Sequence, residues 1–136
     1  MTVFLDASAI VAMIAREPEA TSFAEAMLGE ANRITSPLAI WEAARGVESA
    51  RGVALAEARA PVLDFVEASA LQVISVDTDD TLCALDAHER FGKGVHPAKL
   101  NFGDCFAYAV ARRHDAALLF KGDDFAQIDI KDATLI

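Results

Sequence analysis

Short apolar segments of strand length alternate along this chain with longer segments whose composition favours helices. The expected strands cover 3–5, 33–35, 71–76 and 116–120, with a short last strand at 127–130. The expected helices cover 7–15, 18–28, 37–50, 53–69, 78–91 and 103–114, and 92–100 is an expected loop. Such alternation is typical of a parallel sheet covered by helices on both faces. We therefore predict an α/β fold of three layers, α/β/α, around a central, mainly parallel sheet of four to five short strands.

Two prolines refine the expected helix boundaries. Ser36 is a suitable N-cap and Pro37 a suitable first helical residue, so a helix is expected to begin there. Pro61 lies inside the expected helix at 53–69 and should kink or split it. The length of 136 residues fits one domain, residues 1–136, and an apolar fraction of 54% predicts a packed core rather than disorder.

The cysteine pattern and the N-terminus both favour a cytoplasmic protein. Cys83 and Cys105 lack the pairing pattern of a secreted disulfide scaffold, which favours a reducing compartment. The N-terminus has no basic leader, and Asp6 interrupts its apolar run. No segment approaches the length of a transmembrane helix, so we expect no membrane association.

Negative charge is concentrated in the first two thirds of the chain. The net charge is −9, which argues against binding nucleic acid by bulk electrostatics. Residues 1–87 contain five basic and 14 acidic residues, whereas residues 88–136 contain seven of each. A surface that binds a polyanion should therefore use the C-terminal third. The basic residues there are also consistent with an ordinary solvated surface. The basic residues of this region that could contribute are Arg90, Lys93, His96, Lys99, Arg112, Arg113 and Lys121.

Acidic residues occur at four places where a parallel sheet would bring them together. Asp6 directly follows the first strand, and the Asp123–Asp124 pair follows the strand at 116–120. Both places fall at the carboxyl ends of strands, where α/β proteins bind ligands. Glu42 lies in an otherwise apolar helix, and Asp104 lies in the first turn of another. Helices flanking the same edge of the sheet can add these two carboxylates to the group.

Each acid taken alone also has a structural explanation. Asp6 could cap the helix that follows it, and Glu42 could pair with Arg45 at the surface. Asn101 and Asp104 have the spacing of a capping box, and the closing pair of acids suits a turn after a glycine.

The acids taken together predict a site for divalent cations. Carboxylates gathered without matching Lys or Arg side chains repel one another, and Mg²⁺ or Mn²⁺ relieves that repulsion. Such ions polarise a phosphate, lower the pKa of an attacking water, and reverse the local charge that a polyanion meets. Four carboxylates suffice for one ion or for two.

Three stretches in this order resemble the PIN domain, and within it the toxin of bacterial VapBC toxin–antitoxin pairs. The first is Val3-Phe4-Leu5-Asp6-Ala7-Ser8-Ala9. The second is Leu100-Asn101-Phe102-Gly103-Asp104-Cys105-Phe106-Ala107-Tyr108-Ala109, and the third is Leu118-Leu119-Phe120-Lys121-Gly122-Asp123-Asp124-Phe125. Glu42, on the helix after Ser36-Pro37, matches the glutamate of the family in order and setting. The resemblance spans essentially the whole chain.

The resemblance implies the following site residues. The catalytic acids are Asp6, Glu42, Asp104 and Asp123. Asp123 is preferred to Asp124 because it directly follows the strand and glycine. The implied metal ligands are Asp6, Asp104 and Asp123, with Glu42 and Asp124 as further candidates. Ser8 and Asn101 would support the acids, and Arg112 and Lys121 are weaker candidates for binding substrate phosphate.

The resemblance also implies an activity and partners. It implies a metal-dependent endoribonuclease toxin that hydrolyses tRNA or rRNA with water activated by Mg²⁺ or Mn²⁺. It further implies a cytoplasmic homodimer that a small VapB-like antitoxin neutralises in a higher-order complex. The apolar segment 10–14 and the helical region after Val53 are candidates for groove and dimer surfaces, with core packing as the simpler explanation.

Two alternatives remain open at this stage. The chain could be another Mg²⁺ phosphohydrolase, such as a haloacid-dehalogenase-like phosphatase, although Ser8 stands where that class needs a second aspartate. It could also be a catalytically inactive PIN-like binding module. A zinc enzyme is disfavoured because the three histidines form no ligand pair. A serine or cysteine nucleophile is disfavoured because no serine elbow or neighbouring base is present.

Overall fold

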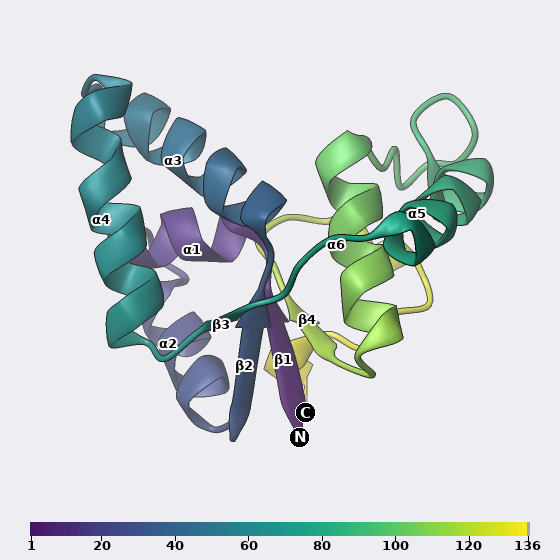
Figure 1. Cartoon of the computed structure of the whole chain (residues 1–136), viewed down its shortest axis with the longest axis horizontal. Helices are drawn as coiled ribbons and strands as arrows, with labels where there is room; N and C mark the ends of the chain where they lie inside the picture. The colour runs from purple at the N-terminus through teal and green to yellow at the C-terminus, as the bar shows by residue number, and fades with distance from the viewer. Residues whose placement is uncertain (136) are drawn as a thin grey trace.

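A four-stranded parallel sheet forms the centre of the molecule, as the computed structural model shows for residues 1–135 (Figure 1). The strands are β1 (Thr2–Leu5), β2 (Asn32–Thr35), β3 (Gln72–Val73) and β4 (Ala117–Leu119). Their spatial order is β3-β2-β1-β4, and every neighbouring pair is parallel. Val3 of β1 is in register with Arg33 of β2 and Ala117 of β4. The predicted mainly parallel α/β sheet is therefore confirmed.

Six helices connect and cover the strands. They are α1 (Ala7–Ile14), α2 (Ala20–Leu28), α3 (Pro37–Arg51), α4 (Leu55–Ala68), α5 (Thr78–Phe91) and α6 (Phe102–Arg113). Two short 3₁₀ helices follow β4, namely η1 (Phe125–Gln127) and η2 (Ala133–Leu135). None of the helices within residues 1–135 combines the length and apolar character needed to cross a lipid bilayer.

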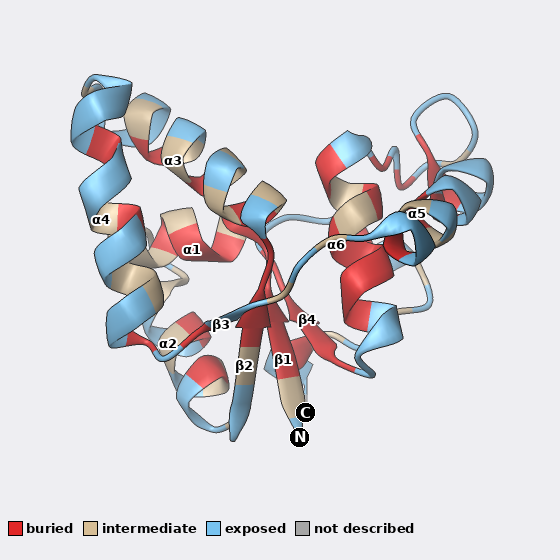
Figure 2. Cartoon of the chain, in the orientation of Figure 1, coloured by how far each residue is buried: buried red, intermediate tan, exposed pale blue. Residues whose placement is uncertain are grey.

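Alternation of side chains along β1 divides the core into two layers. Val3 and Leu5 pack with α1 to α4, whereas Phe4 packs with α5 and α6 on the opposite face of the sheet. This follows from the period of two in a β-strand, which sends successive side chains to opposite faces. Burial is concentrated in the sheet and on the helix faces that cover it (Figure 2). The result is the three-layer α/β/α arrangement.

The two helical layers diverge beyond the carboxyl ends of the strands. The α3–α4 pair lies on one side and the α5–α6 pair on the other, and β1 and β2 end between them (Figure 1). Residues that directly follow β1 and β4, and residues in the first turns of α3 and α6, therefore face a common region.

Local capping residues fix where the helices begin. The Ser36 hydroxyl accepts a hydrogen bond from the backbone N–H of Ala39, and Pro37 occupies the first helical position, as predicted. Gly52 ends α3 in the left-handed conformation, at a φ of 63°, which glycine adopts without strain. The N-cap sets the direction in which α3, the helix that carries Glu42, leaves the sheet.

Three expectations about secondary structure need correction. Pro61 does not split the expected helix, because α4 runs unbroken from Leu55 to Ala68 with Pro61 inside it. The segment 127–130 is not a strand: η1 occupies its start. Only Leu118 bridges to the returning chain, at Asp132. The strand predicted over 71–76 is shortened to Gln72–Val73.

The side chain of Asp129 accounts for the missing last strand. Its carboxylate accepts hydrogen bonds from the Tyr108 hydroxyl, at 2.7 Å, and from Arg90, at 3.1 Å. Its backbone carbonyl accepts another from Arg112, at 2.9 Å. These contacts tie the segment to α5 and α6, so it does not align along β4.

Candidate active site

Asp6 occupies the junction between β1 and α1. Its backbone N–H donates to the Leu119 carbonyl at 3.0 Å, so the ends of β1 and β4 meet there. Its side chain is only 6% exposed and accepts hydrogen bonds from the Ser8 backbone, at 3.1 Å, and the Ser8 hydroxyl, at 2.5 Å. Burial raises the pKa of Asp6, although the bonds from Ser8 oppose the shift. Asp6 is thus both the N-cap of α1 and a buried carboxylate.

Ser8 connects the two strand ends. Its hydroxyl donates to Asp6 and accepts the backbone N–H of Lys121 at 3.0 Å. Lys121 is the second residue after β4, so this bond holds the turn after β4 next to Asp6. Ser8 therefore fixes the orientation of the Asp6 carboxylate.

Glu42 projects from α3 onto the first turn of α6. Its carboxylate lies directly against the Cα atom of Gly103, in the place that a Cβ atom would occupy. Burial raises the pKa of Glu42 from 4.5 to about 7, and the charges of Asp6 and Asp104 add to the shift. Arg45 pairs with Glu48 at 2.9 Å, so the alternative Glu42–Arg45 ion pair does not form.

Asp104 combines a capping role with a place in the acidic group. Its carboxylate accepts the backbone N–H of Asn101 at 3.0 Å, and Asn101 Oδ1 accepts the backbone N–H of Asp104 at 2.9 Å. The predicted capping box is therefore present. Burial raises the pKa of Asp104 to about 6, the Asn101 bond opposes this, and the charges of Asp6 and Asp124 reinforce it. Capping engages Oδ2 of Asp104, and no hydrogen bond to Oδ1 is present within residues 1–135.

The turn after β4 brings Asp124 rather than Asp123 towards the other acids. The charge of Asp124 contributes to the raised pKa of both Asp6 and Asp104. Asp123 makes no such contribution to Asp104. Gly122, at a φ of 103°, adopts a backbone conformation that glycine tolerates without strain, and it directly precedes the two acids. This electrostatic contribution points to Asp124 as the fourth acid, and the sequence-based choice of Asp123 stays a prediction.

Asp6, Glu42, Asp104 and Asp124 form what we call the acidic cluster. None of the four forms a salt bridge with a basic side chain in the described part of the chain. Burial raises the pKa of Asp6, Glu42 and Asp104, and repulsion from neighbouring carboxylates of the cluster adds to each shift. Asp6 is buried, Glu42 and Asp104 are partly buried and Asp124 is exposed, and such a group of carboxylates without counter-charge is the arrangement that a hard cation stabilises.

The donor chemistry of the acidic cluster fits Mg²⁺ or Mn²⁺. Both ions take carboxylate oxygens and keep several water ligands, so not every acid must contact the ion directly. Within residues 1–135, no three acidic, histidine or cysteine side chains converge tightly enough to form a complete ligand set in this conformation. The fit therefore rests on oxygen donors and uncompensated charge, and it favours an ion held partly through water.

The basic residues predicted for substrate phosphate are engaged elsewhere. The Lys121 ammonium pairs with Glu17, at 2.6 Å, and with Glu19, at 3.3 Å. Arg112 donates to the Asp129 carbonyl. Only the backbone of Lys121 approaches the acidic cluster, through Ser8.

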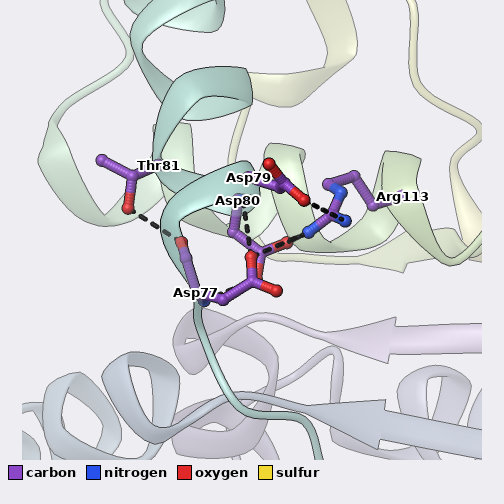
Figure 3. A network of polar contacts seen from close by, with 5 residues as sticks. All are labelled: Asp77, Asp79, Asp80, Thr81 and Arg113. Carbon is purple, nitrogen blue, oxygen red and sulfur yellow. Dashed lines mark hydrogen bonds and ion pairs between the residues drawn. The ribbon is translucent and has the colours of Figure 1, made fainter.

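Arg113 is likewise held in a structural network (Figure 3). Its guanidinium contacts Asp80, at 2.6 Å, and Asp77, at 3.0 Å, while Asp79 lies at 3.7 Å. Asp80 is almost fully buried and forms a capping box with Asp77 at the start of α5. Arg113 therefore joins the C-terminal end of α6 to the N-terminal end of α5 and is not free to bind a polyanion.

Gly103 is the site residue that sequence reasoning missed. A glycine inside the first turn of a helix weakens that helix, which is a sequence signal for close packing against another group. The structure identifies that group as the Glu42 carboxylate, which comes from a distant part of the chain.

Sequence comparison relates the whole chain to one family. The PIN domain family matches residues 3–131. Ribonuclease VapC30 of Mycobacterium tuberculosis is 36% identical over 132 residues, which cover 96% of this chain and 98% of that protein. A VapC ribonuclease of Rhizobium meliloti is 35% identical, with 93% of this chain and 98% of that protein covered.

A solved structure supports the same fold. The crystal structure of Mycobacterium tuberculosis VapC20, described as a Sarcin-Ricin loop cleaving toxin, superposes with a TM-score of 0.73. The match covers 94% of this chain and 95% of VapC20 at 17% sequence identity, so it is a likeness of fold. The family match and the relatives together place this chain in the PIN domain family, among the VapC-like ribonuclease toxins.

Proposed function

We propose that the protein is a metal-dependent endoribonuclease toxin of a toxin–antitoxin module, with the acidic cluster as its catalytic centre. The observation that carries the proposal is the gathering of Asp6, Glu42, Asp104 and Asp124 without a basic partner. The names of the relatives, which are VapC ribonucleases, support RNA as the substrate.

A bound Mg²⁺ or Mn²⁺ would supply Lewis acidity to the scissile phosphate and to the attacking water. Asp6, Asp104 and Asp124 would hold the ion, directly or through water. Ser8 keeps Asp6 oriented, and Asn101 keeps Asp104 at the start of α6. Glu42, whose pKa is raised to about 7, is suited to accept the proton of the attacking water near neutral pH.

We further propose a small antitoxin as the neutralising partner, in a cytoplasmic complex that contains a toxin homodimer. An apolar groove of about 410 Å³ between α3 and α4 suits an apolar helix of such a partner. Leu55 and Leu63 line it and are 40% and 51% exposed. Light scattering of the purified chain tests the dimer. Loss of antitoxin co-purification in Leu63→Glu, with retained nuclease activity, tests the groove.

RNA cleavage tests the proposed activity. Wild type and Asp6→Asn are incubated with total bacterial RNA in Mn²⁺, in Mg²⁺ and in EDTA, with Asp64→Asn as the matched control because Asp64 is an exposed acid on α4. The proposal expects discrete fragments from wild type and Asp64→Asn only, and none in EDTA. Cleavage by Asp6→Asn at the wild-type rate, or cleavage in EDTA, would refute it. A folded wild type that neither cleaves RNA nor binds a divalent ion would support the inactive binding module.

A further inference from the structure

Two large aromatic side chains lie exposed at the edge of the acidic cluster. Trp41 is 62% exposed and Phe102 is 71% exposed. Trp41 directly precedes Glu42, and Phe102 lies two residues before Asp104. With Leu38 and Glu42 they line a single cavity of about 370 Å³ between α3 and α6. The cavity thus has apolar and aromatic walls and one carboxylate of the proposed catalytic centre.

Each ring also contacts a side chain of its own helix. The Arg45 guanidinium lies 5.5 Å from the centre of the Trp41 ring. The Phe102 ring packs against that of Phe106, with centres 5.0 Å apart and an interplanar angle of 52°. The two rings are therefore supported in place while large parts of their surfaces remain open to solvent.

We propose that this cavity binds one unpaired base of the RNA substrate by stacking on Trp41 and Phe102. The inference rests on the proposed nuclease function and specifies the substrate class, namely RNA that is single-stranded next to the cleaved bond. A base in a duplex is stacked on its neighbours and does not present its faces to a protein, whereas a base in a loop or a single strand does.

The charges of the protein explain why a base, and not only the phosphates, has to be bound. The chain carries a net charge of −9. The basic side chains of Lys121, Arg112 and Arg113 are engaged in ion pairs. Phosphate contacts from these three residues therefore supply little affinity. Stacking is insensitive to that charge and acts on any base, because every base has a π-face.

The shared residue Glu42 favours RNA over a protein segment as the occupant. Whatever fills the cavity also lies against Glu42, so it must approach the acidic cluster. A nucleotide whose phosphate is bound at that cluster has a base within reach of the cavity. The groove between α3 and α4 shares Trp41 with this cavity but contains no carboxylate in its lining, so it is the better place for an apolar protein helix.

Fluorescence provides a direct test, because Trp41 is the only tryptophan of the chain. The protein in EDTA, where the proposed nuclease is inactive, is titrated with a single-stranded oligoribonucleotide. The same strand with abasic residues and the same strand in a duplex serve as controls. Stacking predicts quenching by the single strand, with little change for either control.

Kinetics of cleavage in Mg²⁺ provide the second readout. Phe102→Ala and Trp41→Ala should each raise KM for a single-stranded substrate about tenfold. Trp41→Phe should restore most of the loss because it keeps an aromatic face. Leu82→Ala is the matched control, since Leu82 is a 56% exposed side chain on α5 that does not line the cavity.

The outcomes separate this inference from the proposed function. Metal-dependent cleavage with unchanged KM in both alanine variants, or quenching that is equal for the abasic strand, overturns the stacking site and leaves the nuclease intact. Base-dependent quenching without any cleavage supports the site and refutes the nuclease. Trp41 fluorescence that does not respond to RNA but does respond to an added antitoxin overturns the inference, because Trp41 also lines the groove between α3 and α4.

Discussion

The carboxylate of Glu42, on α3, lies in the space that a side chain at position 103, on α6, would fill. Glycine at this position lets an acid from one helical layer reach the acids at the start of the other. The contact therefore couples the separation of α3 and α6 to the position of the residue proposed as general base.

Replacing Gly103 with alanine should reduce activity far more than stability. The new methyl group would meet the end of the flexible Glu42 side chain, which can move away at small energetic cost. Displacement of a reacting group by about 1 Å can lower a rate about 100-fold, so kcat should fall by about 10- to 100-fold. The measurement is RNA cleavage alongside thermal unfolding. Wild-type kcat in Gly103→Ala would show that Glu42 need not occupy this position.

The two acids after Gly122 should differ in importance. Asp124→Asn should lower activity by at least about 100-fold, because its charge is the one that acts on Asp6 and Asp104. Asp123→Asn is the matched control and should stay within about threefold of wild type. The measurement is cleavage rate at saturating Mg²⁺. The reverse ranking would restore the sequence-based preference for Asp123.

Without metal, the protein should become less stable as the pH rises. The raised pKa values of Glu42, about 7, and Asp104, about 6, mean that the folded state binds protons more tightly than the unfolded state. The stabilisation is fully present below about pH 4, where unfolded carboxyls are protonated, and is lost as the pH passes through 6 and 7. Unfolding in EDTA should show a Tm about 5 °C lower at pH 8 than at pH 5.

Two further measurements check the origin of this pH effect. Glu42→Gln should flatten the upper part of the Tm profile, because the amide does not ionise. Mg²⁺ should raise Tm more at pH 8 than at pH 5, because it binds the ionised carboxylates. A Tm in EDTA that increases from pH 5 to pH 8 would show that the acidic cluster does not control stability.

Removing the Arg113 side chain should destabilise the fold without touching the site. Asp80, whose side chain is 2% exposed, would lose its counter-charge, and we expect a cost of about 2 to 3 kcal/mol. Arg45→Ala is the control, since its ion pair with Glu48 is exposed and should contribute less than about 1 kcal/mol. Chemical denaturation of Arg113→Ala and Arg45→Ala measures both. Equal stability of the two variants would show that the buried carboxylate is not held by Arg113.

Features encoded locally in the sequence could be predicted. Buried strands such as β1 and β4 follow from short apolar runs, and the caps at Ser36 and Asn101 follow from residue type and spacing. The order of elements then implied a parallel sheet, and the sheet implied that Asp6 and the turn after β4 would meet.

Features that depend on contacts between distant residues could not be predicted. The last expected strand fails because Asp129 is bonded to Tyr108, on α6, which no local pattern reveals. The choice between Asp123 and Asp124 as the fourth acid depends on the path of the chain after Gly122, which no local pattern specifies. The fit of Glu42 over Gly103 depends on the packing of two helices that are far apart in the sequence.

Calorimetric titration with Mn²⁺ and Mg²⁺ tests most directly whether the acidic cluster is a divalent-ion site. The wild type and the Asp64→Asn control should bind the ion near neutral pH with release of protons, because Glu42 and Asp104 are partly protonated there. Asp6→Asn should bind at least about tenfold more weakly. Absence of binding to a folded wild type, or equal binding by Asp6→Asn, would contradict the account.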